Sequence, residues 1–279
     1  MRILHSSVAS SKLRARYPLC LSPAFLAKLR RNLYATSLGS AEPPSWRRGQ
    51  PERTQKATMP NFSPEMLALG FILYVTFLFS TTCHEAAHAL AAKLGGDETA
   101  FLGGQVSLNP VPHIQRSPWG MVVIPILMLL FNGSIIGWAS APYDPNWERR
   151  HPKRAAWMAL AGPATNYTLM LIAAIALRVA SAKGWLHVNP YTGRGDFASN
   201  VLYAFFSLNL LLGTFNLLPF APLDGSTAIM LFMSESRAQR YLDWLRGNSF
   251  AIAGLLVAVL LFPRIYGPIQ SFVTRILFS

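Results

Sequence analysis

The residues best suited to chemistry are two histidines and a glutamate within residues 81–95. His84, Glu85 and His88 form the pattern His-Glu-x-x-His. Residues four apart on a helix lie on the same face, so both imidazoles could bind one Zn²⁺ from one side. The adjacent glutamate could then act as general base toward water activated by the metal. Taken alone, the motif also fits a helix with two surface histidines.

A catalytic zinc usually takes three protein ligands, so a third donor must come from elsewhere in the chain. No third histidine follows His88 at the required spacing, and Glu98 is the only glutamate nearby. Of the remaining acidic residues, only Asp224 adjoins long apolar sequence, where ionisable groups are costly and usually functional. We therefore predict Asp224 as the third ligand. The alternative is that it caps the helix that follows.

Apolar segments must position these residues. The chain is 52% hydrophobic and only 13% charged, which predicts an all-α polytopic membrane protein. We expect about five to six apolar helices around an intramembrane zinc site, over residues 63–94, 119–138, 155–180, 198–218 and 250–262, with 266–278 completing a bent pair after Pro263 or lying in the interface. The polar, glycine-rich residues 97–117 are expected to form a short hairpin.

The first 58 residues differ from the rest of the chain. They carry eleven Lys and Arg against two acidic residues, which is +9 of the formal +13. This basic segment is interpreted as a transit peptide, a disordered tail, or the product of a start assigned upstream of Met59. The membrane-embedded domain is expected over residues 59–279. Since the charge is concentrated in the tail, it does not indicate a nucleic acid partner.

Two further motifs follow His-Glu-x-x-His along the chain. They are Gly-Pro-x-x-Asn at Gly162, Pro163 and Asn166, and Asn-x-x-Pro-x-x-x-Leu-Asp-Gly at Asn216, Pro219, Leu223, Asp224 and Gly225. The three motifs in this order resemble those of the site-2 proteases, which are intramembrane zinc metalloproteases, and specifically of their compact prokaryotic members. The resemblance covers about Phe62 to the C-terminus. Two departures, Gln115 for an expected acid and Ser226 for a usual second glycine, bear on substrate preference more than on activity.

The resemblance implies an intramembrane zinc metalloendopeptidase that hydrolyses peptide bonds in or near transmembrane segments, as in regulated intramembrane proteolysis. It implies one Zn²⁺ per chain. The implied site residues are Glu85 as catalytic base, His84, His88 and Asp224 as metal ligands, and Asn166, Asn216 and Pro219 as positioning residues.

The broken helices have their own physical interpretation. Asn216 and Pro219 are expected to end the fourth helix before Asp224, so that irregular backbone there faces a water-holding cavity. Gly162 and Pro163 have two interpretations that stay open. They could kink the helix for close packing, or they could free backbone at the active site.

The expected partners are a single-span membrane protein as substrate and the lipid bilayer, in the inner membrane of a bacterial cell. No nucleic acid partner is expected, and no appended regulatory domain is visible in the sequence. The alternative function is a non-catalytic membrane zinc-binding or transport protein, and a third is a catalytically inactive scaffold. A transporter would need neither Glu85 beside a ligand nor a helix broken before Asp224.

The ligands also constrain the path of the chain. The histidines lie toward the end of the first helix and the aspartate follows the fourth, so an odd number of crossings must separate these helices if they point the same way. Full spans at both 119–138 and 155–180 would give two. We therefore predict that residues 119–138 are re-entrant or strongly broken, with Met59 outside and the basic loop at 149–154 cytoplasmic. The alternative is an intact span with Met59 in the cytoplasm.

Overall fold

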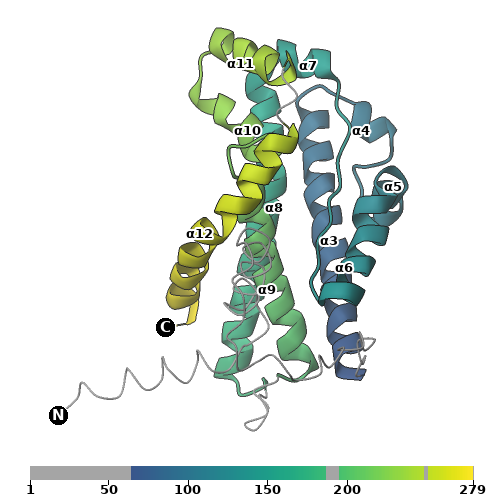
Figure 1. The fold of residues 1–279 in the computed structure, drawn as a ribbon, viewed down its shortest axis with the longest axis vertical. Coiled ribbons are helices and arrows are strands. Elements are labelled where there is room, and N and C mark those ends of the chain that lie inside the picture. The colour runs from purple at the N-terminus through teal and green to yellow at the C-terminus, as the bar shows by residue number, and fades with distance from the viewer. Residues whose placement is uncertain (1–63, 187–194, 248–250, 279) are drawn as a thin grey trace, which may run out of the picture.

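The computed structural model describes residues 64–186, 195–247 and 251–278, and these contain helices and loops but no extended sheet (Figure 1). The predicted tail over residues 1–58 lies outside the described residues. In chain order the elements are α3 (Pro64–Leu94), α4 (Thr99–Leu102), α5 (Pro110–Arg116), the π-helical turn η2 (Trp119–Val123), α6 (Ile124–Asn132), α7 (Pro145–Arg150), α8 (Pro152–Ala182), α9 (Phe197–Asn216), α10 (Asp224–Ala228), the 3₁₀ turn η3 (Ile229–Phe232), α11 (Glu235–Gly247) and α12 (Ala251–Phe278).

Within the part of the chain that the structure describes, four helices are long and apolar enough to cross a membrane: α3, α8, α9 and α12. Large apolar side chains project outward from them, among them Phe71, Ile175 and Leu260, all more than 60% exposed. Water would penalise so much exposed apolar surface, whereas lipid chains do not. The protein is therefore an integral, multi-pass membrane protein with an all-α fold, as the composition predicts.

The central helix of the bundle is α8, which packs against both α3 and α9. In Figure 1, α3 rises toward the end of the molecule where α7 and α11 lie, α8 descends from that end, α9 rises again and α12 descends. Only one spanning helix thus separates α3 from α9, and the two point the same way. This is the relationship that a metal site shared between their C-terminal regions requires.

The chain between α3 and α8 enters and leaves the bundle at the same end. After α5 its direction changes by 110° into the helix that starts at Trp119. That helix ends at Asn132, and Gly133 adopts a left-handed conformation with φ 62°. The chain then returns in extended form beside α3 to α7 (Figure 1). The bend agrees with the prediction of a re-entrant or strongly broken segment, and it lies just before the predicted stretch 119–138.

Hydrogen bonds join the two ends of this segment. The Asp97 carboxylate accepts the Asp144 backbone N–H at 2.8 Å, and the Trp147 indole N–H donates to the Gly95 carbonyl at 3.0 Å. Deeper in the bundle, a side chain on Gly137 would lie 2.3 Å from the Gly120 carbonyl oxygen. Glycine at this position allows the returning chain to lie directly on the helix that starts at Trp119 and against Phe77 of α3.

Two expectations from the sequence were wrong. No hairpin forms at residues 97–117, which instead hold the short helices α4 and α5. The Asn109 side chain caps α5 by accepting the Val111 N–H at 3.0 Å, and Pro110 at the first position favours the helix over a strand. Residues 266–278, expected as the second arm of a bent pair or as an interfacial segment, instead continue the same helix, α12, which runs through Pro263. Proline is tolerated inside membrane helices because neighbouring groups satisfy the freed backbone.

A re-entrant path for residues 119–144 makes a prediction about which side of the membrane each loop faces. In a background without Cys20 and Cys83, cysteines introduced at Ser107 and Asn146 should react with a membrane-impermeant maleimide from the same side. A cysteine at Lys183, at the far end of α8, is the matched control and should react only from the other side. Labelling of Ser107 and Asn146 from opposite sides would mean that residues 119–144 cross the membrane.

Candidate metal centre

The two histidines of the first motif lie well inside the length of α3. His84 and His88 are 10 and 6 residues before the helix end at Leu94, which is about 15 and 9 Å along the axis. Both are buried, with 6% and 7% of their surface exposed. Their burial among spanning helices excludes the interpretation of two surface histidines.

Three donor atoms meet in a small triangle. The Nε2 atoms of His84 and His88 are 2.9 Å apart, and Asp224 Oδ2 lies 3.1 Å from the first and 3.4 Å from the second. Two ligands on a tetrahedral zinc with bonds of about 2.0–2.1 Å are roughly 3.3 Å apart. The three edges therefore match one face of a zinc tetrahedron. Among the described residues, these three form the one His, Cys, Asp or Glu cluster that could hold a metal ion.

The hydrogen bonds on the far side of each imidazole orient it as a ligand. His88 Nδ1 lies 2.7 Å from the Met158 carbonyl oxygen. A carbonyl only accepts, so Nδ1 carries the proton and Nε2 offers a lone pair to the metal. His84 Nδ1 lies 2.6 Å from Asn166 Oδ1, which has the same effect. The predicted residue Asn166 thus contacts the site through a ligand.

Asp224 reaches the histidines because the chain breaks after α9. That helix ends at Asn216, residues 217–223 form an irregular loop, and α10 begins at Asp224. A Cβ on Gly225 would lie 2.3 Å from the Leu217 carbonyl oxygen, so glycine lets the loop fold back on itself. The Lys153 ammonium then donates to the Met230 carbonyl at 3.0 Å, which ties the turn after α10 to α8.

The capping alternative for Asp224 is not supported by its contacts. The buried Oδ2 atom has no hydrogen-bond partner among the described residues, and the N-cap position of α10 is Leu223. Oδ2 is the same atom that faces both histidines. A buried carboxylate oxygen without a hydrogen-bond donor, aimed at two imidazole lone pairs, fits a cation between them. Glu98 is exposed on the loop after α3 and lies outside the cluster.

Gly162 provides the space for the metal centre. A Cβ at this position of α8 would lie 2.3 Å from His88 Nε2 and 2.5 Å from His84 Nε2. No side chain of any size can therefore stand there while the two nitrogens face each other. Gly162 thus serves close packing, here against the ligand nitrogens themselves, and both Gly162 and Pro163 lie within the continuous helix α8.

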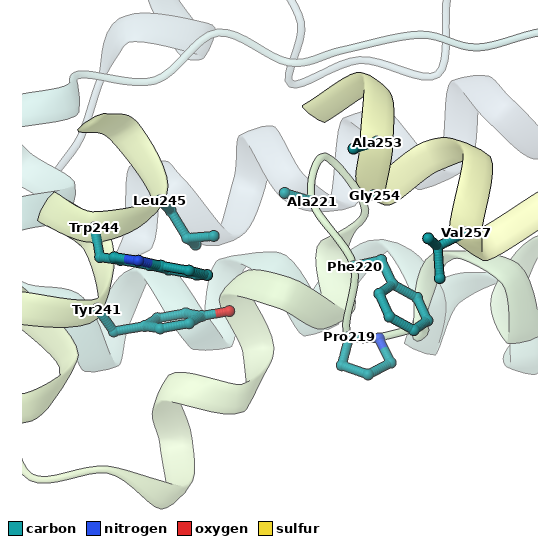
Figure 2. Close-up of a pocket in the computed structure, with 9 residues that line it drawn as sticks. All are labelled: Pro219, Phe220, Ala221, Tyr241, Trp244, Leu245, Ala253, Gly254 and Val257. Atoms are coloured by element: carbon teal, nitrogen blue, oxygen red, sulfur yellow. The ribbon is translucent and has the colours of Figure 1, made fainter. Parts of the chain in front are cut away.

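The remaining predicted site residues, Glu85, Asn216 and Pro219, differ in how deeply they are buried. Glu85 is buried, with 5% of its surface exposed, and its carboxylate makes no hydrogen bond to the described residues. Asn216 is half-buried at the end of α9. Pro219 is exposed and lines an apolar cavity of about 250 Å³ between the loop, α11 and α12 (Figure 2). The Met158 carbonyl is a contact that the sequence did not predict, because a backbone group leaves no signal in residue type.

Gly162→Ala should lower zinc affinity by at least about tenfold, the range seen when groups that orient metal ligands are lost. The added methyl collides with both ligand nitrogens, while alanine favours the helix over glycine. Gly70→Ala is the matched control, since a Cβ there meets nothing within 4 Å. The measurement is competition with a chromogenic chelator. Equal affinities for the two variants would contradict the steric role of Gly162.

Asp224→Ala should lose bound zinc, and with it the hydrolytic activity that the resemblance implies. Two histidines alone hold the metal weakly, and the charge of the metal ion is no longer offset by a carboxylate. Asp243→Ala removes an acid that lies 3.1 Å from Arg149 on the surface and should keep its zinc. Metal content per purified chain is the measurement. Full zinc content in Asp224→Ala together with loss in Glu98→Ala would assign the third ligand to Glu98.

Comparison with known proteins gives two curated relatives. The protein named "Putative zinc metalloprotease YwhC" of Bacillus subtilis (strain 168) is 35% identical over 161 residues, which cover 57% of this chain and 68% of that protein. "Putative zinc metalloprotease Rip3" of Mycobacterium tuberculosis is 30% identical over 190 residues, in both the Erdman and H37Rv strains. That match covers 67% of this chain but only 36% of Rip3.

No family model matches the chain, and no solved structure matches it. The relatives and the donor triangle together confirm zinc as the cofactor. The helical membrane fold agrees with the resemblance to site-2 proteases that the three motifs carry. This chain belongs to the site-2 protease family of zinc metalloproteases.

Proposed function

We propose that this protein is an intramembrane zinc endopeptidase, which hydrolyses peptide bonds in or near the transmembrane segment of single-span membrane proteins. The observation that carries the proposal is the burial of the donor triangle among the spanning helices α3, α8 and α9, below the end of α3. A peptide bond must enter the bundle to reach it. In this proposal the protein resides in the inner membrane of a bacterial cell.

The chain's residues divide the chemistry among them. When bound, zinc supplies a Lewis acid that polarises a carbonyl and lowers the pKa of water to about 7. The Glu85 carboxylate takes a proton from the attacking water as its oxygen bonds to the peptide carbon, and passes it to the leaving nitrogen as the C–N bond breaks. Two neutral histidines and the Asp224 carboxylate reduce the charge of the site to +1, which is less costly to bury than +2.

The loop at residues 217–223 is suited to hold the substrate. It is irregular backbone close to a spanning helix, a feature that membrane proteins tolerate where the backbone is buried in protein or lines a cavity. Pro219 is exposed on it, and the loop ends at the ligand Asp224. We propose that Asn216 and Pro219 shape this loop so that an extended segment of substrate passes beside the metal. An unwound substrate is needed because a helix shields its own peptide bonds.

Glu85→Gln should abolish proteolysis while zinc stays bound. The glutamine keeps the volume of glutamate but cannot accept a proton, and the three ligands are unchanged. Purified protein is reconstituted in liposomes with a panel of tagged single-span proteins, and the products are mapped by mass spectrometry. Wild-type protein should cut within or next to the apolar segment. Metal content, measured in parallel, should stay near one zinc per chain in both proteins.

Two outcomes would overturn the proposal. Full cleavage by Glu85→Gln would remove this residue as the base. Cleavage by wild-type protein that falls only in soluble loops, far from any apolar segment, would make the protein a membrane-anchored protease of another kind. Zinc flux into liposomes without any cleavage across the panel would instead favour the transport alternative.

A further inference from the structure

A chain of buried amides connects His84 to α9. His84 Nδ1 bonds to Asn166 Oδ1, and Asn166 Nδ2 donates to Asn209 Oδ1 at 2.8 Å. Asn209 Nδ2 in turn donates to Ser80 Oγ and to the Phe205 carbonyl, both at 2.9 Å. Asn166, Asn209 and Ser80 all have 0% of their surface exposed. The network therefore joins α3, α8 and α9 at the level of the metal ligands, with no solvent to take the place of a lost partner.

The Phe205 carbonyl determines the donor and acceptor of each hydrogen bond between Asn209 and His84. The Phe205 carbonyl can only accept, so the amide nitrogen of Asn209 must face it and the amide oxygen must face Asn166. That oxygen can only accept, so Asn166 must present Nδ2 to it and turn Oδ1 toward His84. Because Oδ1 accepts, the proton of His84 must sit on Nδ1, and Nε2 keeps its lone pair for the metal.

An asparagine alone would not hold this orientation. The amide group of Asn166 could rotate by 180°, which would exchange its oxygen and nitrogen at nearly the same volume. Nδ2 would then face His84 Nδ1 and require a lone pair there, which would move the proton to Nε2. A protonated Nε2 cannot bind zinc. The tautomer of His88 cannot change in this way, because its Nδ1 lies against the Met158 carbonyl, which can only accept a hydrogen bond.

We propose that Asn209 is a positioning residue of the metal centre, which fixes the amide of Asn166 so that His84 presents Nε2 to zinc. Asn209 lies on α9, and its hydrogen bonds go to Asn166, Ser80 and the Phe205 carbonyl, none of which is a proposed metal ligand. In this proposal it acts on the metal centre through Asn166. Its sequence signal is a single amide within the apolar run Ser207-Leu208-Asn209-Leu210-Leu211. The inference rests on the zinc site and not on the peptidase activity proposed above.

A purely structural role predicts different behaviour, and the chain offers a matched control. Thr214 also lies on α9 and joins it to α8, through a hydrogen bond of 3.1 Å between Thr214 Oγ1 and the Tyr167 hydroxyl. It is buried as well, with 5% exposure. Thr214→Val therefore removes one buried contact between the same two helices without touching the amide chain. Any effect that Asn209 variants share with it belongs to helix packing.

The experiment measures zinc affinity of the purified full-length protein in detergent by chelator competition, without reference to any substrate. Asn209→Leu should lose about 10–100-fold in affinity, as other outer partners of metal ligands do. Thr214→Val should stay within about threefold of wild type. The double variant Asn166→Asp, Asn209→Leu should recover at least about tenfold. A carboxylate accepts through either oxygen, so it fixes the His84 tautomer without an orienting partner.

Each result decides the inference. Loss in Asn209→Leu with rescue by Asn166→Asp supports it, because a packing defect would not respond to the second change. Equal affinity of Asn209→Leu and Thr214→Val, or a double variant no tighter than Asn209→Leu, would overturn it. If Asn209→Leu does not fold, Asn209→Val takes its place with the same expectations. Absence of proteolysis would contradict the proposed function and leave this result unaffected.

Discussion

The structure depends on placing three metal-binding atoms in apolar surroundings with each lone pair aimed at one point. Water cannot supply missing hydrogen bonds inside the bundle, so each donor must be oriented by the protein itself. A backbone carbonyl orients the His88 ring, and the Asn166 amide orients the His84 ring. The break after α9 brings the Asp224 carboxylate to both of them. Asn166, Asn209 and Ser80 link α8, α9 and α3 beside the ligands, while the outer faces of these helices carry the apolar side chains that lipid accepts.

The metal site also requires segments of backbone to approach one another closely, which glycine permits. Gly162 lets α8 lie against the ligand nitrogens, and Gly225 lets the ligand loop fold on itself. Gly254 extends the same principle to α12, where a Cβ would lie 2.2 Å from the Ala221 carbonyl oxygen. That contact places α12 directly on the loop before Asp224, beside the apolar cavity (Figure 2). Small residues at helix contacts are the usual means of tight packing in membranes, where burial of apolar surface between helices gives little driving force.

The path of the chain between α3 and α8, which enters and leaves the bundle at the same end, reconciles the metal site with the order of the helices. The histidines of α3 and the aspartate that follows α9 can bind one metal because α3 and α9 point the same way. They do so because the one spanning helix between them in the described chain is α8 (Figure 1). Hydrogen bonds from Asp144 and Trp147 back to residues 95–97 close the segment at one end. The same end carries α7 and α11, where burial raises the pKa of Glu148 and the adjacent Arg246 opposes that shift.

The sequence by itself determined the membrane class, the approximate ranges of α3, α8 and α9, and the residues proposed as ligands. Hydropathy and motif spacing are properties of the linear sequence, so His84, His88 and Asp224 could be proposed as ligands without knowing that they lie close together. Tertiary structure decided what depends on contacts between distant segments: the bend before Trp119, helices in place of the hairpin, the space at Gly162 and the amide chain through Asn209. Residue type records which groups a side chain offers, but only packing decides which partner it meets and which way an amide must face.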